Sequence, residues 1–213
     1  VVREVSELVE HRYPHHPGST ENFALPVRRE QAKQLLDQFI AQRLPRFGEF
    51  QDAMWEGEFF LYHSRLSTSL NIKLLSPQEV CRAAESAYHQ GKAPLSAVEG
   101  FIRQILGWRE YIRGVYWTAD EGYENQNFLE HRRPLPAFFW DGKTDMRCLA
   151  DTLEGVHRNA YSHHIQRLMI TGLFCLLYGV DPNQLNDWHV ASHADAIDWV
   201  STPNVIGMSQ YAD

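Results

Sequence analysis

The hydrophobic positions of this chain recur at helical spacing, and no segment alternates with the period of two that is typical of β-strands. The pattern predicts helices at about residues 28–43, 77–89, 97–117, 144–158, 163–177, 182–191 and 193–200, with a short helix within 62–71. Two capping boxes, Ser76 to Glu79 and Ser96 to Glu99, mark helix starts, and Gly179 marks a helix end. We therefore expect an all-α protein.

One predicted helix begins with an unusual group of polar residues. Ser162 is a suitable N-cap, and His163, His164 and Arg167 follow it before an apolar run that continues to Leu177. Cations near the positive end of a helix dipole are disfavoured, and burying a lone arginine is costly. Two interpretations stay open from these residues alone. Either Arg167 meets a carboxylate and the histidines are neutral and hydrogen-bonded, or the group forms a pocket for an anionic or polar ligand.

Two further segments carry candidate ligand-binding residues. The stretch 62–71 places four hydroxyls, an arginine and an amide at a short helix, which suits a phosphate or sugar-phosphate ligand, although such clusters more often simply cap helices. In the helix at 97–117, Gly107 and Gly114 each cost about 1 kcal/mol of helix stability. That cost suggests a packing purpose, in which another backbone or a flat ligand approaches closely.

Other patterns are weaker. His11, His15 and His16 could bind a metal, but we interpret this turn-rich stretch as a solvated connecting loop. His189 and His193 are four residues apart, a possible metal pair, but two ligands are too few for a site. The chain has no P-loop, no Gly-x-Gly-x-x-Gly and no Gly-x-Ser-x-Gly motif.

Composition adds limits on location and partners. The 213 residues can form one large domain or two small ones. A net charge of -7 gives no support for binding nucleic acid over the whole surface, although it leaves room for a local basic face. Three widely spaced cysteines favour a reducing compartment. Without a signal peptide or a run of about 18 apolar residues, we expect a soluble, cytoplasmic protein with no membrane partner.

The ends of the chain indicate that it is part of a longer protein. Val1 is not an initiator methionine, and the chain stops at Asp213 without a polar tail. We interpret residues 1–26 as an interdomain connector and residues 27–213 as one helical domain that is incomplete at its C-terminus. We expect a monomer.

Several of these motifs, in this order, resemble the FAD-binding helical domain of the photolyase/cryptochrome family. They are most similar to its prokaryotic iron–sulfur branch, which contains bacterial (6-4) photolyases and cryptochrome-like photoreceptors. The matching segments are 47–58, 62–77, 104–114, 163–169, 179–182 and 203–213. The resemblance covers almost everything from about residue 23 onward, and several long motifs in the correct order make it specific.

The resemblance implies a noncovalent FAD and assigns residues to it. These are His63, Ser64, Arg65, Leu66 and Ser67 at the pyrophosphate, Gln104, Trp108 and Arg109 on the adenine and lesion side, and Arg167, Asp195 and Ser201 beside the isoalloxazine. It thus names Asp195 as the carboxylate that Arg167 requires. It also places His163 and His164 at the lesion, where one acts as general acid. A neutral or shared-proton histidine suits that role near neutral pH.

Other assignments concern electron transfer and further cofactors. Trp140 and Trp188 match positions used for electron hopping, although a large core also needs tryptophans. Cys148 matches the first of four thiolates that bind a 4Fe–4S cluster, whose other three ligands would lie beyond Asp213. The resemblance therefore implies the cluster and an antenna chromophore only in the full-length protein, and a plain thiol at Cys148 in this chain.

The implied function is light-driven repair of UV-induced pyrimidine photoproducts in damaged DNA, especially (6-4) lesions. Reduced flavin would donate an electron, and a histidine would assist by proton transfer. Two departures favour a non-repairing cryptochrome-like photoreceptor instead. Ser201 stands where the family has a larger amide or acidic side chain near the flavin, and His189 stands where an aromatic electron donor is expected. A third alternative is a helical fragment without bound flavin.

Overall fold

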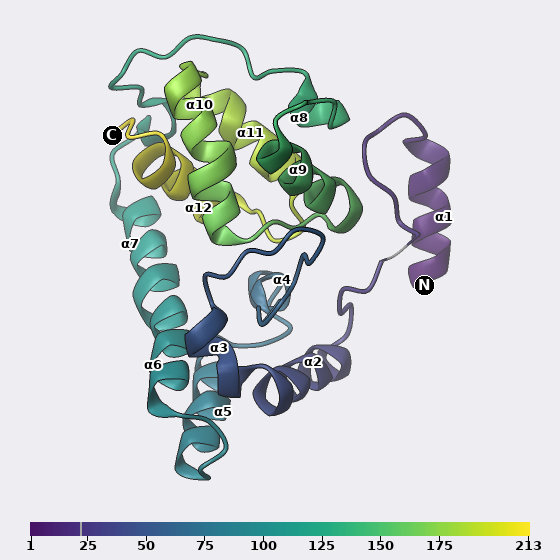
Figure 1. The fold of residues 1–213 in the computed structure, drawn as a ribbon, viewed down its shortest axis with the longest axis vertical. Coiled ribbons are helices and arrows are strands. Elements are labelled where there is room, and N and C mark those ends of the chain that lie inside the picture. The colour runs from purple at the N-terminus through teal and green to yellow at the C-terminus, as the bar shows by residue number, and fades with distance from the viewer. Residues whose placement is uncertain (22) are drawn as a thin grey trace. The chain divides into compact units, whose positions relative to one another are not determined.

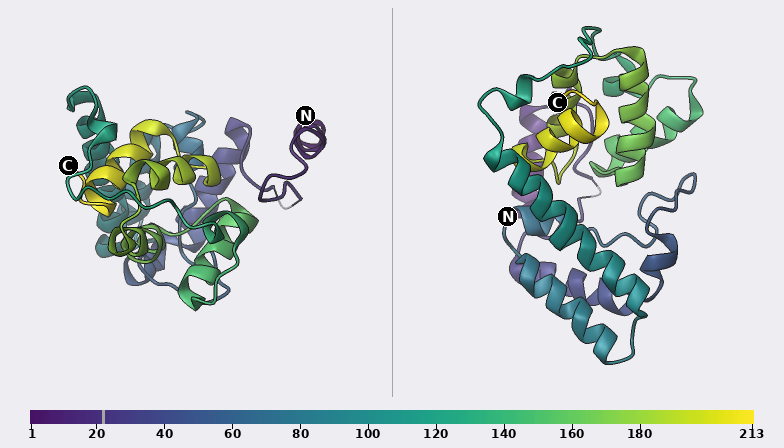
Figure 2. Two further views of the ribbon diagram at one scale, coloured as in Figure 1. Left: turned by 90° about the horizontal axis from the view of Figure 1, so that it is seen from above. Right: turned by 90° about the vertical axis from the view of Figure 1, so that its left-hand side faces the viewer.

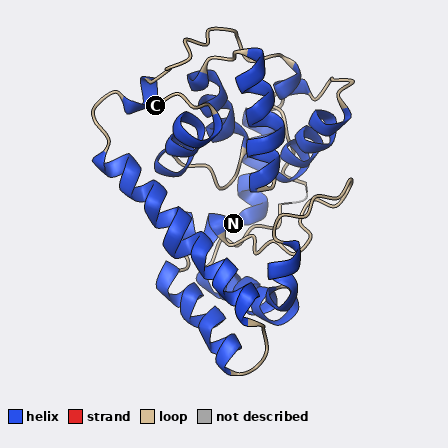
Figure 3. Ribbon diagram, turned by 60° about the vertical axis from the view of Figure 1, so that its left-hand side comes forward, coloured by secondary structure: helices blue, strands red, loops and turns tan. Residues whose placement is uncertain are grey.

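A computed structural model describes residues 1–21 and 23–213 of the chain. Within these ranges the protein is built from helices joined by loops, and no strand is present (Figure 3). These ranges contain two isolated β-bridges, one between Trp55 and Glu58 and one between Arg133 and Val180. The expected all-α class is thus what the described residues form.

The chain divides into two compact units. The middle unit contains residues 25–117, and the end unit contains residues 1–24 together with 118–213. The expected assignment of residues 27–213 to one FAD-binding domain, with 1–26 as a connector, stays a prediction.

The middle unit contains six α-helices and one π-helical segment among its described residues. They are α2 (Arg29–Gln42), α3 (Leu44–Phe50), α4 (Ser67–Asn71), α5 (Pro77–His89), α6 (Leu95–Arg103), the π-helical η1 (Gln104–Arg109) and α7 (Glu110–Thr118) (Figure 1). The last three form one continuous rod (Figure 2). The sequence predicted that rod as an uninterrupted α-helix, and the structure differs by the π-helical turn in its middle.

One of the two predicted capping boxes is present. At the start of α5, the Glu79 amide donates to Ser76 Oγ (3.1 Å), and the Ser76 amide donates to Glu79 Oε2 (3.3 Å). The second prediction, at Ser96, is wrong. α6 begins earlier, after Pro94, because this proline holds an extended backbone and its carbonyl accepts the first helical hydrogen bonds, from Ala97 and Val98.

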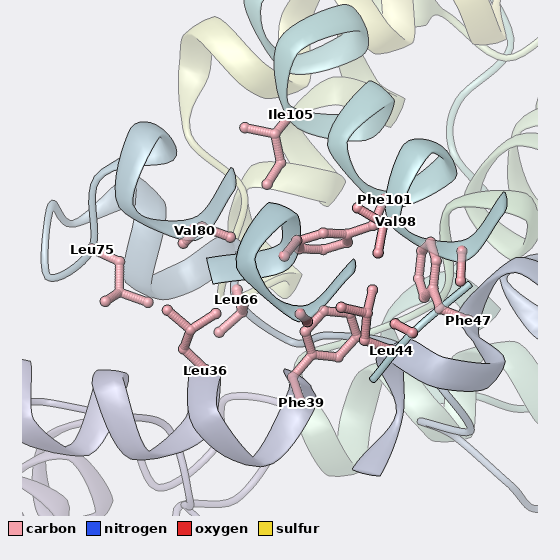
Figure 4. Packing of buried hydrophobic residues seen from close by; sticks show 14 of the residues in the cluster. Leu36, Phe39, Leu44, Phe47, Leu66, Leu75, Val80, Val98, Phe101 and Ile105 are labelled. Atoms are coloured by element: carbon pink, nitrogen blue, oxygen red, sulfur yellow. The ribbon is translucent and has the colours of Figure 1, made fainter. Parts of the chain in front are cut away.

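Three phenylalanines from different helices hold the core of the middle unit together. The ring centroid of Phe39 lies 4.7 Å from that of Phe101 and 5.9 Å from that of Phe47, and the rings of Phe47 and Phe101 are 5.6 Å apart (Figure 4). Leu36, Leu44, Leu66 and Leu75 are buried around this cluster. Edge-to-face and tilted ring contacts of this kind add to the free energy gained by burying the rings.

The glycine that allows close packing in this unit is Gly48, which the sequence did not single out. A Cβ at Gly48 would lie 3.0 Å from the Ala97 Cα, so α3 and α6 can approach only because position 48 has no side chain. A Cβ at Gly107 or Gly114 would meet nothing within 4 Å among the described residues. The expected backbone approach at those two glycines is therefore wrong within the middle unit, and the flat-ligand alternative stays a prediction.

The end unit has its own core, centred on Trp188. Its described helices are α1 (Val2–Arg12), the 3₁₀ turn η2 (Tyr123–Asn125), α8 (Phe138–Asp141), α9 (Arg147–Asn159), the π-helical η3 (Gln166–Gly172), α10 (Leu173–Tyr178), α11 (Pro182–Ser192), α12 (Asp198–Pro203) and the π-helical η4 (Asn204–Ser209). The indole of Trp188 is fully buried, and Phe139, Leu153 and Cys175 pack in the same cluster. Helices from distant parts of the chain thus converge on one side chain.

Some helix ends in the end unit agree with the predictions from the sequence, and others do not. Gly179 ends α10 with a left-handed φ of 81°, and Asp181 caps α11 by accepting a hydrogen bond from the Asn183 amide (2.9 Å), both as predicted. The helix expected from residue 144 begins at Arg147, and the last helix covers 198–203 rather than 193–200. α1 was not predicted, because it buries no residue and therefore needs no strong hydrophobic period.

Removing one buried leucine should show how much the core of the middle unit contributes. Leu36 on α2 is 4% exposed, so Leu36→Ala should lower the free energy of unfolding by about 2–5 kcal/mol. Leu95 on α6 is 57% exposed, and Leu95→Ala should change it by no more than about 0.5 kcal/mol. Urea unfolding of both variants checks this, and equal losses would contradict the assignment of the core.

Candidate functional site

The predicted site residues fall in both units. The middle unit contains His63, Ser64, Arg65, Leu66, Ser67, Gln104, Trp108 and Arg109. The end unit contains Trp140, Cys148, His163, His164, Arg167, Trp188, Asp195 and Ser201.

In the middle unit, a tight turn presents Arg65 and two serines at the start of α4. The backbone of Arg65 is left-handed, with φ at 58°, a conformation that costs a non-glycine residue about 1–3 kcal/mol. Buried Leu66 anchors the turn, and its amide donates to Ser64 Oγ (3.4 Å). The Arg65 guanidinium carbon lies 3.7 Å from the centroid of the Phe60 ring, a cation–π contact that holds the side chain in place.

Two hydroxyls next to this turn were missed as individual candidates. Thr68 Oγ1 and Ser69 Oγ are buried, and neither has a hydrogen-bond partner within residues 1–21 and 23–213. Buried polar groups are normally hydrogen-bonded, so an orphaned pair beside a cationic turn is unusual. The sequence signal for them was the run of hydroxyls in 62–71, which did not distinguish these two from their neighbours.

Arg109 joins the η1 segment to the end of α4. Its Nη2 donates to Asn71 Oδ1 (3.2 Å), and its Nη1 lies 3.6 Å from a Glu110 carboxylate oxygen. Burial lowers the pKa of Arg109, and the Glu110 carboxylate opposes that effect. The structure thus brings two of the predicted flavin-binding segments together. Gln104 and Trp108 also lie on η1, and both are exposed.

In the end unit, Arg167 makes the ion pair that the resemblance implied. Its Nη2 donates to Asp195 Oδ1 (2.9 Å), and its Nε donates to the Ser162 carbonyl (3.0 Å). The Arg167 and Asp195 side chains are 22% and 13% exposed, so water screens this pair only in part. The carboxylate that the first interpretation of Arg167 required is therefore present. The place of the pair beside a flavin stays a prediction.

The two histidines before Arg167 have different environments. The Ile165 amide donates to His163 Nδ1 (3.3 Å), and the His163 amide donates to Gln166 Oε1 (2.9 Å). Buried His163 therefore caps the helix, and the predicted N-cap role of Ser162 is wrong, because the Ser162 hydroxyl is engaged by His193 instead. His164 is the first helical residue and is exposed.

His189 and His193 are buried against Trp188. Burial, and secondarily the Arg167 cation, lower the pKa of His189 from 6.5 to about 3. The same two causes hold the pKa of His193 well below its ordinary value, with His189 adding to them. Both imidazoles are therefore neutral at physiological pH. No group of three or more metal-ligating side chains occurs in the described part of the chain, around this pair or around His11, His15 and His16.

The remaining predicted residues differ in exposure. Trp188 Nε1 donates to the Phe139 carbonyl (3.0 Å), which joins buried Trp188 to the residue that precedes exposed Trp140. Cys148 is an exposed thiol on α9, and Ser201 is buried on α12. None of the described helices is long and apolar enough to cross a membrane.

Known proteins resemble this chain in sequence. It is 52% identical over all 213 of its residues to a (6-4) photolyase from Agrobacterium fabrum (strain C58 / ATCC 33970), of which it covers 42%. It is 37% identical over 96 residues, 45% of its length, to uncharacterized protein R853 of Acanthamoeba polyphaga mimivirus, of which it covers 73%. No protein-family model matches the chain.

Solved structures share its fold. A bacterial class III photolyase from Agrobacterium tumefaciens matches with a TM-score of 0.70 at 16% identity, over 87% of this chain and 38% of that one. A cryptochrome from Synechocystis sp. PCC6803 matches with a TM-score of 0.74 at 15% identity, over 94% of this chain and 43% of that one. At these identities the likeness concerns the fold alone, and it confirms the expected fold.

These findings define the class as the helical FAD-binding-domain fold of photolyases and cryptochromes. The chain belongs to the photolyase/cryptochrome family, as its motifs indicated. Membership of this family implies a flavin cofactor. The chain spans 42% of the length of the curated photolyase that it matches.

The buried histidines should make the fold acid-sensitive. The unfolded chain takes up a proton at His189 below about pH 6.5, whereas the folded chain does so only near pH 3. Folding stability should therefore fall by about 1.4 kcal/mol per pH unit, for each such histidine, as the pH drops through that window. His189→Phe should reduce this slope by about 1.4 kcal/mol per pH unit, the contribution of one histidine. Urea unfolding at several pH values measures the slope. The same substitution at exposed His11 is the control, and parallel slopes for wild type and His189→Phe would contradict the prediction.

Proposed function

We propose that the protein carrying this chain is a FAD-dependent photolyase that repairs UV-induced pyrimidine photoproducts in DNA, in particular (6-4) lesions. The observation that carries the proposal is the start of η3, where exposed His164 follows buried His163 and the Arg167–Asp195 ion pair lies one turn further on. Identity of 52% over the whole chain to a protein named (6-4) photolyase supports it.

The residues at α4 fit the phosphates of FAD. Arg65 supplies a fixed cation, and Ser64 and Ser67 add partly exposed hydroxyls. The orphaned hydroxyls of Thr68 and Ser69 are further polar groups that lack a protein partner among the described residues. A charged donor with several hydroxyls is the set that binds phosphate oxygens strongly. We assign the pyrophosphate to this turn.

Reduced FAD, when bound, supplies the light-driven electron that such repair requires. The chain's own contribution is to hold the damaged base and to move a proton. His164 is exposed at the beginning of a helix, so a base flipped out of the duplex can reach its ring. His163 accepts at Nδ1 from the Ile165 amide, so its proton is on Nε2. We propose His164 as the proton donor and His163 as the alternative donor.

Other features of the function are extensions of this proposal. Buried Trp188 and exposed Trp140 would return electrons from the surface to the flavin, helped by the bond from Trp188 to the Phe139 carbonyl. Exposed Cys148 would be one ligand of a 4Fe–4S cluster in the full-length protein. Damaged DNA is the proposed partner, with an antenna chromophore as a further cofactor. The free cysteines suit the cytoplasm.

Replacing the proposed acid should abolish most repair. His164→Asn should lower the rate of (6-4) lesion repair under blue light by about 10²–10⁴-fold, the usual contribution of a general acid. Flavin content should be unchanged, and repair is measured as loss of lesions from an oligonucleotide. His89→Asn, at an exposed histidine of α5, is the control and should repair at the wild-type rate. Full repair by His164→Asn would remove His164 from this role.

A cryptochrome-like photoreceptor is the second candidate. Buried Ser201 and neutral, buried His189 favour it, since both depart from the side chains expected near the flavin and in its electron supply. Three measurements on the wild-type protein would establish this alternative over repair. The flavin would be photoreduced, no lesions would be repaired, and lesion DNA would bind no tighter than intact DNA.

If the turn at Arg65 binds the phosphates of FAD, removing the charge of Arg65 should lower the affinity for FAD. Arg65→Gln should weaken FAD binding by about 10–100-fold, because a hydrogen bond to a charged group contributes about 1.5–3 kcal/mol. Arg82→Gln, at an exposed arginine of α5, should bind as wild type does. Quenching of FAD fluorescence measures both affinities. Equal affinity in the two variants would contradict the turn as a phosphate site, and absence of flavin binding by wild type would support a helical protein without flavin.

A further inference from the structure

His193, at the end of α11, contacts a hydroxyl with each of its two ring nitrogens. Its Nε2 lies 2.9 Å from Ser162 Oγ, and its Nδ1 lies 3.0 Å from Ser192 Oγ. The side chain is buried, as is Ser162.

The hydroxyl of Ser192 determines which nitrogen of His193 carries the proton. Ser192 Oγ donates its only proton to the Trp188 carbonyl, at 2.6 Å. It must therefore accept a hydrogen bond from His193 Nδ1–H. In a neutral imidazole the other nitrogen then has a free lone pair, so His193 Nε2 accepts the hydroxyl proton of Ser162. The result is a hydrogen-bond chain with one direction, from Ser162 through His193 and Ser192 to the Trp188 carbonyl.

The groups around His193 keep its ring neutral. Arg167 faces it from η3 and His189 faces it from the preceding turn of α11. A proton added at Nε2 would meet the Arg167 cation and would remove the acceptor for Ser162. Burial, the largest effect, and the Arg167 cation lower the pKa of His193, whereas a hydrogen bond with the His189 backbone raises it. Burial prevails, so the direction of the chain is kept near neutral pH.

Ser162 directly precedes the pair of histidines and is held at two atoms. Its hydroxyl donates to His193 and its carbonyl accepts from Arg167 Nε, which in turn pairs with Asp195. The Ala194 amide also donates to the Ala160 carbonyl (2.9 Å), two residues before Ser162. The turn before η3 is thus bound to the segment that follows α11 at three points, and the His193 contact is the one made by two buried, uncharged side chains.

We propose that His193 is a positioning residue: by accepting the Ser162 hydroxyl, it fixes the turn that carries His163 and His164. The proposal rests on the proposed function only where it concerns proton transfer, because the contact itself is a property of the fold. Without this contact the backbone at Ser162 would have one hydrogen bond fewer to hold it, so the next residue, His163, whose Nδ1 accepts from the Ile165 amide, would be less firmly placed. A proton donor that is displaced by about 1 Å can cost about 10²-fold in rate.

Two substitutions of similar polarity separate positioning from general stability. The amide end of glutamine lies near the place of His193 Nε2, so His193→Gln keeps an acceptor for Ser162. Asparagine is one methylene shorter and reaches only the place of Nδ1, so His193→Asn loses that contact. Ser162→Ala removes the same contact from the other side. The double variant Ser162→Ala/His193→Asn should then be no worse than either single one, because all three lack one hydrogen bond.

Two readouts are measured on the full-length protein. The first is hydrogen exchange of the Ile165 amide by NMR, which should be faster in Ser162→Ala and His193→Asn and at the wild-type rate in His193→Gln. The second is light-driven repair at equal FAD content. We expect repair to fall by about tenfold or more in Ser162→Ala and His193→Asn, and to stay within about threefold of wild type in His193→Gln.

The outcomes distinguish this inference from the proposed function. Equal Ile165 exchange in His193→Gln and His193→Asn, or a ring-nitrogen NMR spectrum showing the proton of His193 on Nε2, would overturn the positioning role whatever the repair activity. Absence of repair in wild type would overturn the proposed function, and the exchange measurements would still decide whether His193 fixes the turn.

Discussion

A single partly buried cation, Arg167, determines how the end unit is arranged around its candidate catalytic residues. Its guanidinium joins the Asp195 carboxylate to the Ser162 carbonyl, so that two segments separated by about thirty residues of chain are held by one side chain. Leaving either charge without the other would expose the remaining one to a poorly solvated site, which is strongly unfavourable. Burial, and secondarily the Arg167 cation, lower the pKa of His189 and of His193, so both of these nearby imidazoles stay neutral.

The two units contribute different chemistry to the proposed flavoprotein. The middle unit offers a cationic turn with hydroxyls, stabilised by the cation–π contact of Arg65 with Phe60 and by the Arg109–Asn71 bond. The end unit offers the exposed imidazole of His164 and the buried, neutral imidazoles of His189 and His193 against Trp188. The proposed anion binding and the proposed proton transfer thus belong to separate cores, each with its own aromatic cluster.

Local signals made much of the fold predictable, while the site depended on distant contacts. The capping box at Ser76 and the stop at Gly179 act over a few residues, and a sequence shows them directly. The sequence predicted a start of α6 at Ser96, but the helix begins directly after Pro94, whose own backbone is extended. The Ser162–His193 bond joins residues 31 apart, so no periodicity reveals it, and Ser162 was assigned to the local role of a cap instead. Asp195 was named as the partner of Arg167 through resemblance, since spacing alone offered several carboxylates.

The π-helical turn at Gln104–Arg109 has a consequence for how insertions and deletions would act on this protein. A π-helical turn accommodates one residue more than an α-helical turn, so it behaves as a single-residue insertion stored inside the rod of α6 and α7. Loss of one residue within this turn would let the rod relax to a regular α-helix with its two sides still in phase. Loss of one residue from a regular α-helical part of the rod would instead rotate one side by about 100° about the axis. Arg109 could not then point toward Asn71 while the Phe101 side of the rod stayed in its core. The place at which a residue is gained or lost in this rod therefore decides whether the contacts on its two sides can form together, independently of which side chains it carries.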